Sequence, residues 1–247
     1  SENNRLEQTL IFANRGAILD RNGVELATND IKSADSDFAG RHYADIPGLS
    51  HLVGYIKYPL VDKAGNYYEK EYRAKDGAEL VYDGVLKGKN GTKLVETDVR
   101  GEVTSESVVD KPVDGNSITL SADAKLTEAL YKAIKNLAET SRFVGGAGVI
   151  VNVENGEILA LTSFPEYDQN AMTKGIDQKT FNSLVNDKST PFLNRIVGGL
   201  YTPGSIIKPF IAVGVLDQKI IDPMKQILST GSISVPNPYF PDKPSVF

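Results

Sequence analysis

The clearest pattern of apolar residues lies in residues 123–140, where they recur at the three- and four-residue spacing of a helix. The positions are Leu126, Ala129, Leu130, Ala133, Ile134 and Leu137. We predict one helix here, with this stripe as its buried face. Shorter helices are predicted over residues 77–86, 177–186 and 205–217.

Two Asn-Gly pairs predict β-hairpins, because these residues readily adopt the backbone of a two-residue turn. They are Asn22-Gly23 between strands at 17–20 and 24–27, and Asn155-Gly156 between strands at 148–153 and 157–162. Further strands are predicted at residues 51–56, 92–95, 99–109 and 117–120. The polar, tyrosine-rich residues 62–71 are predicted to form a loop.

Residues 111–116 contain Pro112 and Gly115 and have the composition of a linker. We therefore predict two domains, residues 1–112 and residues 113–247. The first is expected to be a mixed module of short strands and helices. In the second, helices are expected to cover an antiparallel sheet, so the fold class is α+β.

The composition argues against several classes of function. Of the 247 residues, 40% are hydrophobic and 24% are charged, and the net charge of -5 argues against a nucleic-acid partner. The chain has no cysteine and only two histidines, which excludes cysteine nucleophiles and makes a histidine metal site improbable. No apolar run reaches the ~20 residues of a membrane helix, so we expect any anchor to lie outside these residues.

The candidate chemistry lies in the segment Tyr-Thr-Pro-Gly-Ser-Ile-Ile-Lys-Pro-Phe, residues 201–210. Pro203 and Gly204 precede Ser205, which places Ser205 at the N-terminus of the predicted helix, where negative charge is favoured. Lys208 follows three residues later and is expected on the same face. A partly desolvated lysine can accept the serine proton, so Ser205 and Lys208 are the candidate nucleophile and base.

The Ser-x-x-Lys spacing alone is weak evidence, because about one chance occurrence is expected in a chain of this size. In an arbitrary protein with this spacing, the serine is more often a helix cap and the lysine a solvated side chain. The apolar residues around Lys208 predict that this part of the helix is buried, and a buried lysine needs a specific role.

The same segment resembles the active-site serine motif of penicillin-binding proteins. Residues 146–161 and 163–170 are similar to the first hairpin of their transpeptidase domain and to the loop after it. Residues 15–27 match the pattern Arg-Gly-x-Ile-x-Asp-Arg-Asn-Gly-x-x-Leu-Ala of the class B, monofunctional members. This long pattern is far more specific than Ser-x-x-Lys.

Residues 182–195, followed directly by the serine motif, resemble the elongation-type members, the penicillin-binding protein 2 branch. The segments at residues 41–43 and 51–55 resemble their pedestal, so we interpret His51 as structural and not catalytic. The resemblance extends from about residue 14 to residue 240. There are two departures: only residues 28–40 stand where the family has a long pedestal head, and no Ser-x-Asn or Lys-Thr-Gly motif follows Ser205.

The resemblance implies a dimerisation-type pedestal at residues 1–112 and the N-terminal part of a serine β-lactamase-like transpeptidase domain at residues 113–247. It implies that Ser205 forms an acyl-enzyme with peptidoglycan stem peptides or β-lactams, with Lys208 as proton acceptor and no cofactor. Expected partners are a membrane-embedded glycan polymerase and other elongation proteins. The expected location is the extracytoplasmic, periplasmic face of the bacterial plasma membrane.

Two other functions remain open from the sequence. The chain could be a non-catalytic interaction module of the elongation machinery, because two motifs of the family do not occur in it. A β-lactam sensor domain also uses Ser-x-x-Lys, but such sensors lack the pattern seen at residues 15–27.

Overall fold

The computed structural model describes residues 5–30, 36–98, 100, 102–226, 228–229, 231–232, 234–240 and 245–246. The chain divides into two compact units, Ser1–Gly199 and Leu200–Phe247. Within the described ranges, no helix is both long and apolar enough to cross a membrane.

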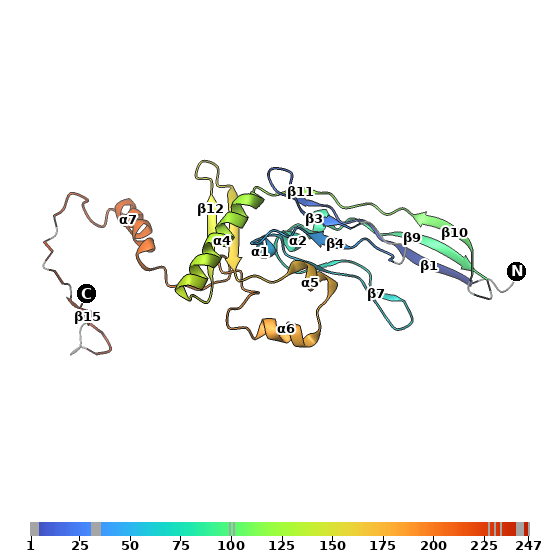
Figure 1. The fold of residues 1–247 in the computed structure, drawn as a ribbon. Helices are drawn as coiled ribbons and strands as arrows, with labels where there is room; N and C mark the ends of the chain where they lie inside the picture. Colours follow the sequence, from blue (N-terminus) through green and yellow to red (C-terminus); the bar gives the residue numbers. More distant parts are fainter. Residues whose placement is uncertain are drawn as a thin grey trace. The chain divides into compact units, whose positions relative to one another are not determined.

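A three-stranded antiparallel sheet lies at the N-terminal end of the first unit (Figure 1). Its strands, in the order β1-β9-β10, are β1 (Arg5–Ile11), β9 (Gly91–Thr97) and β10 (Val103–Asp110). In the register, Ile11 pairs with Gly91 and Val103 pairs with Thr97. The strand predicted at 92–95 is confirmed as β9, and the strand predicted at 99–109 is confirmed from Val103 onward as β10; Val99 and Gly101 lie outside the described residues.

A second sheet has the strand order β11-β2-β3-β4. Its strands are β2 (Ile18–Leu19), β3 (Glu25–Asn29), β4 (Arg41–Tyr43) and β11 (Ile118–Thr119). The predicted hairpin at Asn22-Gly23 is confirmed, and Gly23 has φ +81°. Oδ1 of Asp20 stabilises this turn because it accepts hydrogen bonds from the backbone N–H groups of Asn22, at 2.7 Å, and Val24, at 2.8 Å.

Short helices and strand pairs fill the rest of the N-terminal module. They are α1 (Ser50–Val53), β5 (Ile56–Lys57), β6 (Leu60–Val61), β7 (Tyr67–Glu69), β8 (Arg73–Ala74), α2 (Gly77–Val81) and α3 (Asp83–Leu86). The helix predicted at 77–86 is confirmed as α2 and α3. The prediction of a loop at residues 62–71 is partly wrong, because residues 67–69 of this segment form the strand β7, which pairs with β6.

The strand predicted at residues 51–56 is wrong over its first half, since His51 to Val53 belong to α1. The helical turn is closed by a hydrogen bond of 2.8 Å from the N–H of Val53 to the carbonyl of Leu49. It ends at Gly54, which has φ +80°. The apolar residues of this segment pack in the core without forming a strand, so tertiary packing outweighs their β-propensity.

The core of this module lies between the second sheet and the short helices. Its buried members are Ile18, Leu26, Ala27, Tyr43, Leu49, Val53, Ala78, Leu86 and Ala124. Ala124 is the first residue of α4, so the core joins the N-terminal module to the elements that follow.

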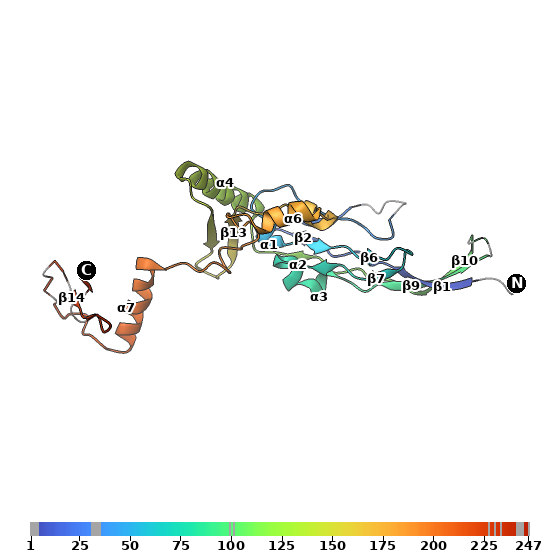
Figure 2. The same cartoon turned by 90° about the horizontal axis from the view of Figure 1, so that it is seen from below.

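Helix α4 (Ala124–Ser141) packs against the antiparallel hairpin of β12 (Gly146–Val151) and β13 (Ile158–Phe164) (Figures 1 and 2). Asp123 caps the helix by accepting the N–H of Leu126 at 2.9 Å. Glycine in β12 permits the close approach, since a Cβ at Gly146 would lie 2.8 Å from a methyl carbon of Ile134. The predicted helix and the second predicted hairpin are confirmed.

The buried face of α4 differs from the prediction. The buried residues are Ala124, Thr127, Tyr131 and Ala138, whereas Ala129, Ala133 and Leu137 are exposed. The hairpin covers only the side of the stripe that carries Leu130 and Ile134, which are half-buried. The adjacent side of α4, which carries Tyr131, is buried instead. Tyr131 packs there against Phe164 of β13, with 5.7 Å between the ring centroids.

The segment after β13 is tied back to the N-terminal module. The carboxylate of Glu166 accepts the N–H groups of Gly48 at 2.7 Å and Ser50 at 3.0 Å, at the start of α1. The side-chain amide of Asn170 both accepts from and donates to the backbone of Tyr43, at 3.0 and 2.9 Å. These contacts place α5 (Gln169–Lys174) beside β4. Helix α6 (Gln178–Val185) follows, as predicted.

The second unit contains the 3₁₀ turn η1 (Gly204–Ile207) and the helix α7 (Lys208–Asp217). Two short strands, β14 (Ser234–Val235) and β15 (Ser245–Val246), form an antiparallel pair.

Candidate active site

Ser205 lies in the 3₁₀ turn η1 and not in an α-helix, so the predicted helix start is three residues too early. Pro209 explains the difference. In an α-helix the N–H of residue 209 would donate to the carbonyl of Ser205, but proline has no N–H. That carbonyl instead accepts the N–H of Lys208, which closes a 3₁₀ turn. Gly204, with φ +57°, supplies the break before the turn.

The turn type preserves the spacing that the chemistry needs. A 3₁₀ helix has three residues per turn, so residues i and i+3 lie one above the other. Ser205 and Lys208 are therefore brought to one side of the turn by the backbone. Neither side chain has a hydrogen-bond or ion-pair partner among the described residues.

The expectation that Lys208 is buried is wrong. Both Ser205 and Lys208 are exposed, and the apolar side chains around them are exposed as well, with Phe210 at 73% and Ile206 at 73%. The described residues of this unit contribute only a helix, a turn and a short strand pair. Among the described residues these elements do not cover α7, and no residue of this helix is buried.

The approach to the serine segment is held by Arg195, which the sequence analysis did not single out. Arg195 is 8% exposed, and its guanidinium group donates hydrogen bonds to the backbone carbonyls of Ser189 and Leu193. Ser163 of β13 joins this loop from the other side: its hydroxyl donates to the Leu193 carbonyl at 3.0 Å and accepts the Arg195 N–H at 3.2 Å. The loop before Leu200 is therefore fixed to the hairpin.

A buried charge cluster lies in the N-terminal module. The carboxylate of Glu79 accepts hydrogen bonds from Nε of Arg15 at 2.5 Å and from Nε of Arg41 at 2.8 Å. None of the three side chains has any exposed surface. The hydroxyl of Tyr43 donates to the same carboxylate at 3.2 Å. Burial, together with the Glu79 charge, raises the pKa of Tyr43, so its hydroxyl stays a donor. The only sequence signal for this cluster is the presence of Arg15 and Arg41 in family-like segments.

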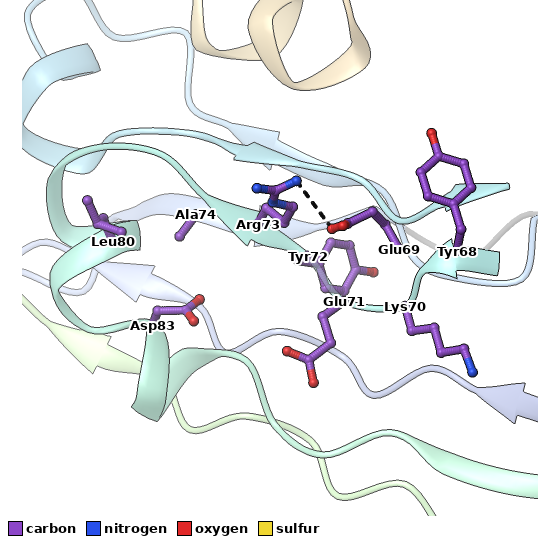
Figure 3. Close-up of a pocket in the computed structure, with 9 residues that line it drawn as sticks. All are labelled: Tyr68, Glu69, Lys70, Glu71, Tyr72, Arg73, Ala74, Leu80 and Asp83. Carbon is purple, nitrogen blue, oxygen red and sulfur yellow. Dashed lines mark ion pairs between the residues drawn. The ribbon is translucent and has the colours of Figure 1, made fainter.

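A cleft of about 570 Å³ is formed by residues 68–74 with Leu80 and Asp83, and neither Ser205 nor Lys208 lines it (Figure 3). Charges of both signs line it, and its Glu69–Arg73 ion pair, at 3.4 Å, is marked in Figure 3. In the part of the chain that the structure describes, no three His, Cys, Asp or Glu side chains are grouped so that they could hold a metal ion.

Comparison with known families gives two matches. Residues 37–120 match the penicillin-binding protein dimerisation domain, and residues 146–243 match the penicillin binding protein transpeptidase domain. The serine segment lies inside the second match.

Individual relatives agree with these matches. The peptidoglycan D,D-transpeptidase MrdA of Escherichia coli K12 is 34% identical over 73% of this chain and 29% of its own length. A chain of a peptidoglycan synthase complex that coordinates polymerization and crosslinking has a TM-score of 0.71 at 25% identity, over 94% of this chain and 52% of that chain.

The PBP2 structure of Pseudomonas aeruginosa, in complex with WCK 5153, has a TM-score of 0.67 at 28% identity, over 94% of this chain and 46% of that chain. The chain thus spans less than a third of the E. coli relative and about half of the two solved chains. It belongs to the penicillin-binding proteins, with a dimerisation-type module followed by part of a transpeptidase domain.

Proposed function

We propose that this chain is part of a peptidoglycan D,D-transpeptidase of cell-wall elongation, with Ser205 as its nucleophile. The observation that carries the proposal is the 3₁₀ turn that brings Ser205 and Lys208 to one side, inside the region that matches the transpeptidase domain. The relatives named MrdA support the same reaction class.

In the proposed mechanism, the Ser205 hydroxyl attacks the carbonyl of the penultimate D-alanine of a stem peptide, and Lys208 takes its proton. The C–N bond to the terminal D-alanine breaks, and that D-alanine leaves with a proton. An amine of a neighbouring stem peptide then attacks the ester carbonyl and forms the cross-link, while the bond to the Ser205 oxygen breaks and that oxygen regains a proton from the amine by way of Lys208. β-Lactams acylate the same oxygen.

The backbone of η1 contributes to transition-state stabilisation in this mechanism. The N–H of Ser205 lies in the first turn, where N–H groups have no acceptor within the helix. It has no partner among the described residues, so it is free to donate to a developing oxyanion. The reaction requires no metal ion or organic cofactor.

The modules have separate proposed roles. We place residues 1–112 in the pedestal and residues 113–247 in the transpeptidase domain. The protein acts at the extracytoplasmic, periplasmic face of the plasma membrane. Its proposed partners are a membrane-embedded glycan polymerase and other elongation proteins. The synthase complex to which a similar chain belongs supports this arrangement.

Labelling of the full-length protein by a fluorescent penicillin tests the proposal. We expect Ser205→Ala to abolish covalent labelling and Lys208→Ala to slow it by at least about a hundredfold, the scale of general-base catalysis. The exposed Ser183→Ala and Lys219→Ala are the matched controls and should label normally. Persistent labelling of Ser205→Ala would reject the assigned nucleophile, and an unlabelled wild-type protein would favour a non-catalytic role.

A further inference from the structure

The chain contains three Asn-Gly pairs, at residues 22–23, 90–91 and 155–156. An asparagine before glycine can lose its side-chain amide without an enzyme, because the glycine nitrogen has no side chain beside it to hinder attack on the asparagine Cγ. The structure gives the three asparagines different hydrogen-bond partners. The three pairs therefore differ in how easily this reaction can occur.

Asn22 is restrained through its amide nitrogen. Nδ2 donates to a carboxylate oxygen of Asp20 at 3.3 Å and to one of Asp123 at 2.8 Å. These bonds hold the side chain in place. The two carboxylates also oppose the negative charge that develops on the amide oxygen when Cγ is attacked.

Asn90 is fixed at both ends of its side-chain amide. Oδ1 accepts the N–H of Ala13 at 2.9 Å, and Nδ2 donates to the carbonyl of Lys70 at 2.8 Å. Gly91 is buried in the paired strand β9, and a Cβ there would lie 2.3 Å from the carbonyl oxygen of Asp110. The nitrogen of Gly91 therefore cannot turn toward Cγ without disrupting the sheet.

Asn155 is exposed, and its hydrogen bonds favour attack at Cγ. It lies with Gly156 in the exposed loop between β12 and β13 (Figure 1). Oδ1 accepts the N–H of Glu157 at 3.0 Å, and Nδ2 has no partner among the described residues. The bond to Oδ1 draws electron density from Cγ and stabilises the oxyanion that forms on attack. The unbonded nitrogen is free to leave as ammonia.

The backbone does not distinguish the two exposed turns. In each, the glycine N–H donates to a backbone carbonyl of the same turn, at 2.8 Å for Gly156 and at 3.1 Å for Gly23. The reaction at either site therefore follows local opening of an exposed turn. The difference lies in the side chains: Asn22 remains tied to Asp123, outside its turn, whereas Asn155 has no bond outside its own loop.

We propose that Asn155 is a site of spontaneous deamidation in this protein. The Gly156 nitrogen releases its proton to water and bonds to Cγ; the Cγ–Nδ2 bond then breaks, and ammonia leaves after Nδ2 has taken up a proton from water. Water opens the resulting succinimide ring at either carbonyl, which leaves an aspartyl or an isoaspartyl residue. Both products add a carboxylate to the loop, and the isoaspartyl form also lengthens its backbone. The site is separate from Ser205 and does not depend on the proposed acylation.

Site-resolved mass spectrometry of the intact chain, kept in neutral buffer at physiological temperature, tests the proposal. We expect Asn155 to deamidate at least about fivefold faster than Asn22 or Asn90, because only its side chain is unrestrained. In urea the three rates should agree within about twofold, since unfolding removes the hydrogen bonds that distinguish the sites. Protein L-isoaspartate methyltransferase should methylate the peptide that contains residue 155.

Two variants complete the test. Asn155→Gln keeps an amide, but attack would require a larger ring, so most of the methyltransferase signal of the folded chain should disappear. Asn136→Gln replaces an exposed asparagine of α4 that precedes leucine, and it should leave the signal unchanged. The proposal is overturned by an unmodified Asn155, by equal rates at the three pairs in the folded chain, or by a purely aspartyl product, which would mean hydrolysis without the ring.

Discussion

Glu79 has no exposed side-chain surface, and three side chains from other parts of the module donate to it. Arg15 and Arg41 are 64 and 38 residues away in the sequence, so the carboxylate joins segments that the chain brings together only on folding. Loss of one member of such a buried cluster leaves uncompensated charge in the core.

Glu79→Gln should therefore lower the free energy of unfolding by about 3–5 kcal/mol, measured by urea denaturation. Glu71→Gln is the matched control, because Glu71 pairs with Lys87 at 3.4 Å with a side chain 65% exposed. Its effect should lie within about 1 kcal/mol. Equal effects of the two substitutions would show that the buried cluster contributes no special stability.

Asp20 gives a prediction for pH dependence. Burial opposes its charge, but N–H donors from Ala124, Val24 and Asn22 outweigh burial, so its pKa lies below the unfolded value of 3.8. A lowered pKa stabilises the fold above pH 3.8, and this contribution is lost as the pH falls through the folded pKa. The stability gap between wild type and Asp20→Asn should be constant near neutral pH and shrink below pH 3.8; a gap independent of pH would contradict the assignment.

At the scale of elements, the strand β2 depends on a close backbone approach at Gly16. A Cβ at this position would lie 2.0 Å from the carbonyl oxygen of Asn116, just before β11. The parallel β2–β11 pairing, Ile18 with Ile118, begins immediately afterwards. A side chain at position 16 would push the two segments apart.

We expect Gly16→Ala to destabilise the protein by at least about 1–3 kcal/mol, because rigid backbone atoms must move. Gly84→Ala is the control: Gly84 is in α3, no atom lies within 4 Å of its ideal Cβ, and alanine should stabilise the helix by about 0.5–1 kcal/mol. Thermal unfolding of both variants measures the difference. Similar melting temperatures would argue against the close approach.

Elements with strong local signals could be predicted from the sequence. Asn22-Gly23, Asn155-Gly156 and the cap Asp123 each act on residues next to them, and the hairpins and α4 are where they were expected. The helical turn at His51 and the exposure of Lys208 were missed, because both depend on what packs against them. For the same reason the pairing of Arg15 and Arg41 with Glu79 could not be predicted, although both arginines lie in family-like segments.

At the scale of the whole molecule, the proposed domain boundary at residue 112 lies in a segment with many backbone contacts. Val113 exchanges hydrogen bonds of 2.7 and 2.8 Å with Lys89, and the Gly115 N–H donates to the Asn14 carbonyl at 2.9 Å. Contacts across this point also include those of Glu166 and Asn170.

A fragment of residues 113–199 should consequently fail to fold alone, whereas residues 1–199 should unfold cooperatively on heating. The fragment would keep α4 and the hairpin but lose the partners of Glu166, Gln169 and Asn170 in the N-terminal module. Circular dichroism during heating distinguishes the two. A sharp transition of the fragment would mean that these contacts are dispensable.

The two hydrogen bonds from Gly48 and Ser50 to Glu166 determine when this part of the chain can finish folding during its synthesis on the ribosome. Gly48 is made 118 residues before the carboxylate that accepts its N–H, and Ser50 is made 116 residues before it. A nascent chain therefore carries these amides without their acceptor for a long stretch of elongation. The hydrogen bonds of Gly48, Ser50 and Tyr43 form only after the ribosome has passed Asn170, so folding of this part is completed by residues that match the transpeptidase domain.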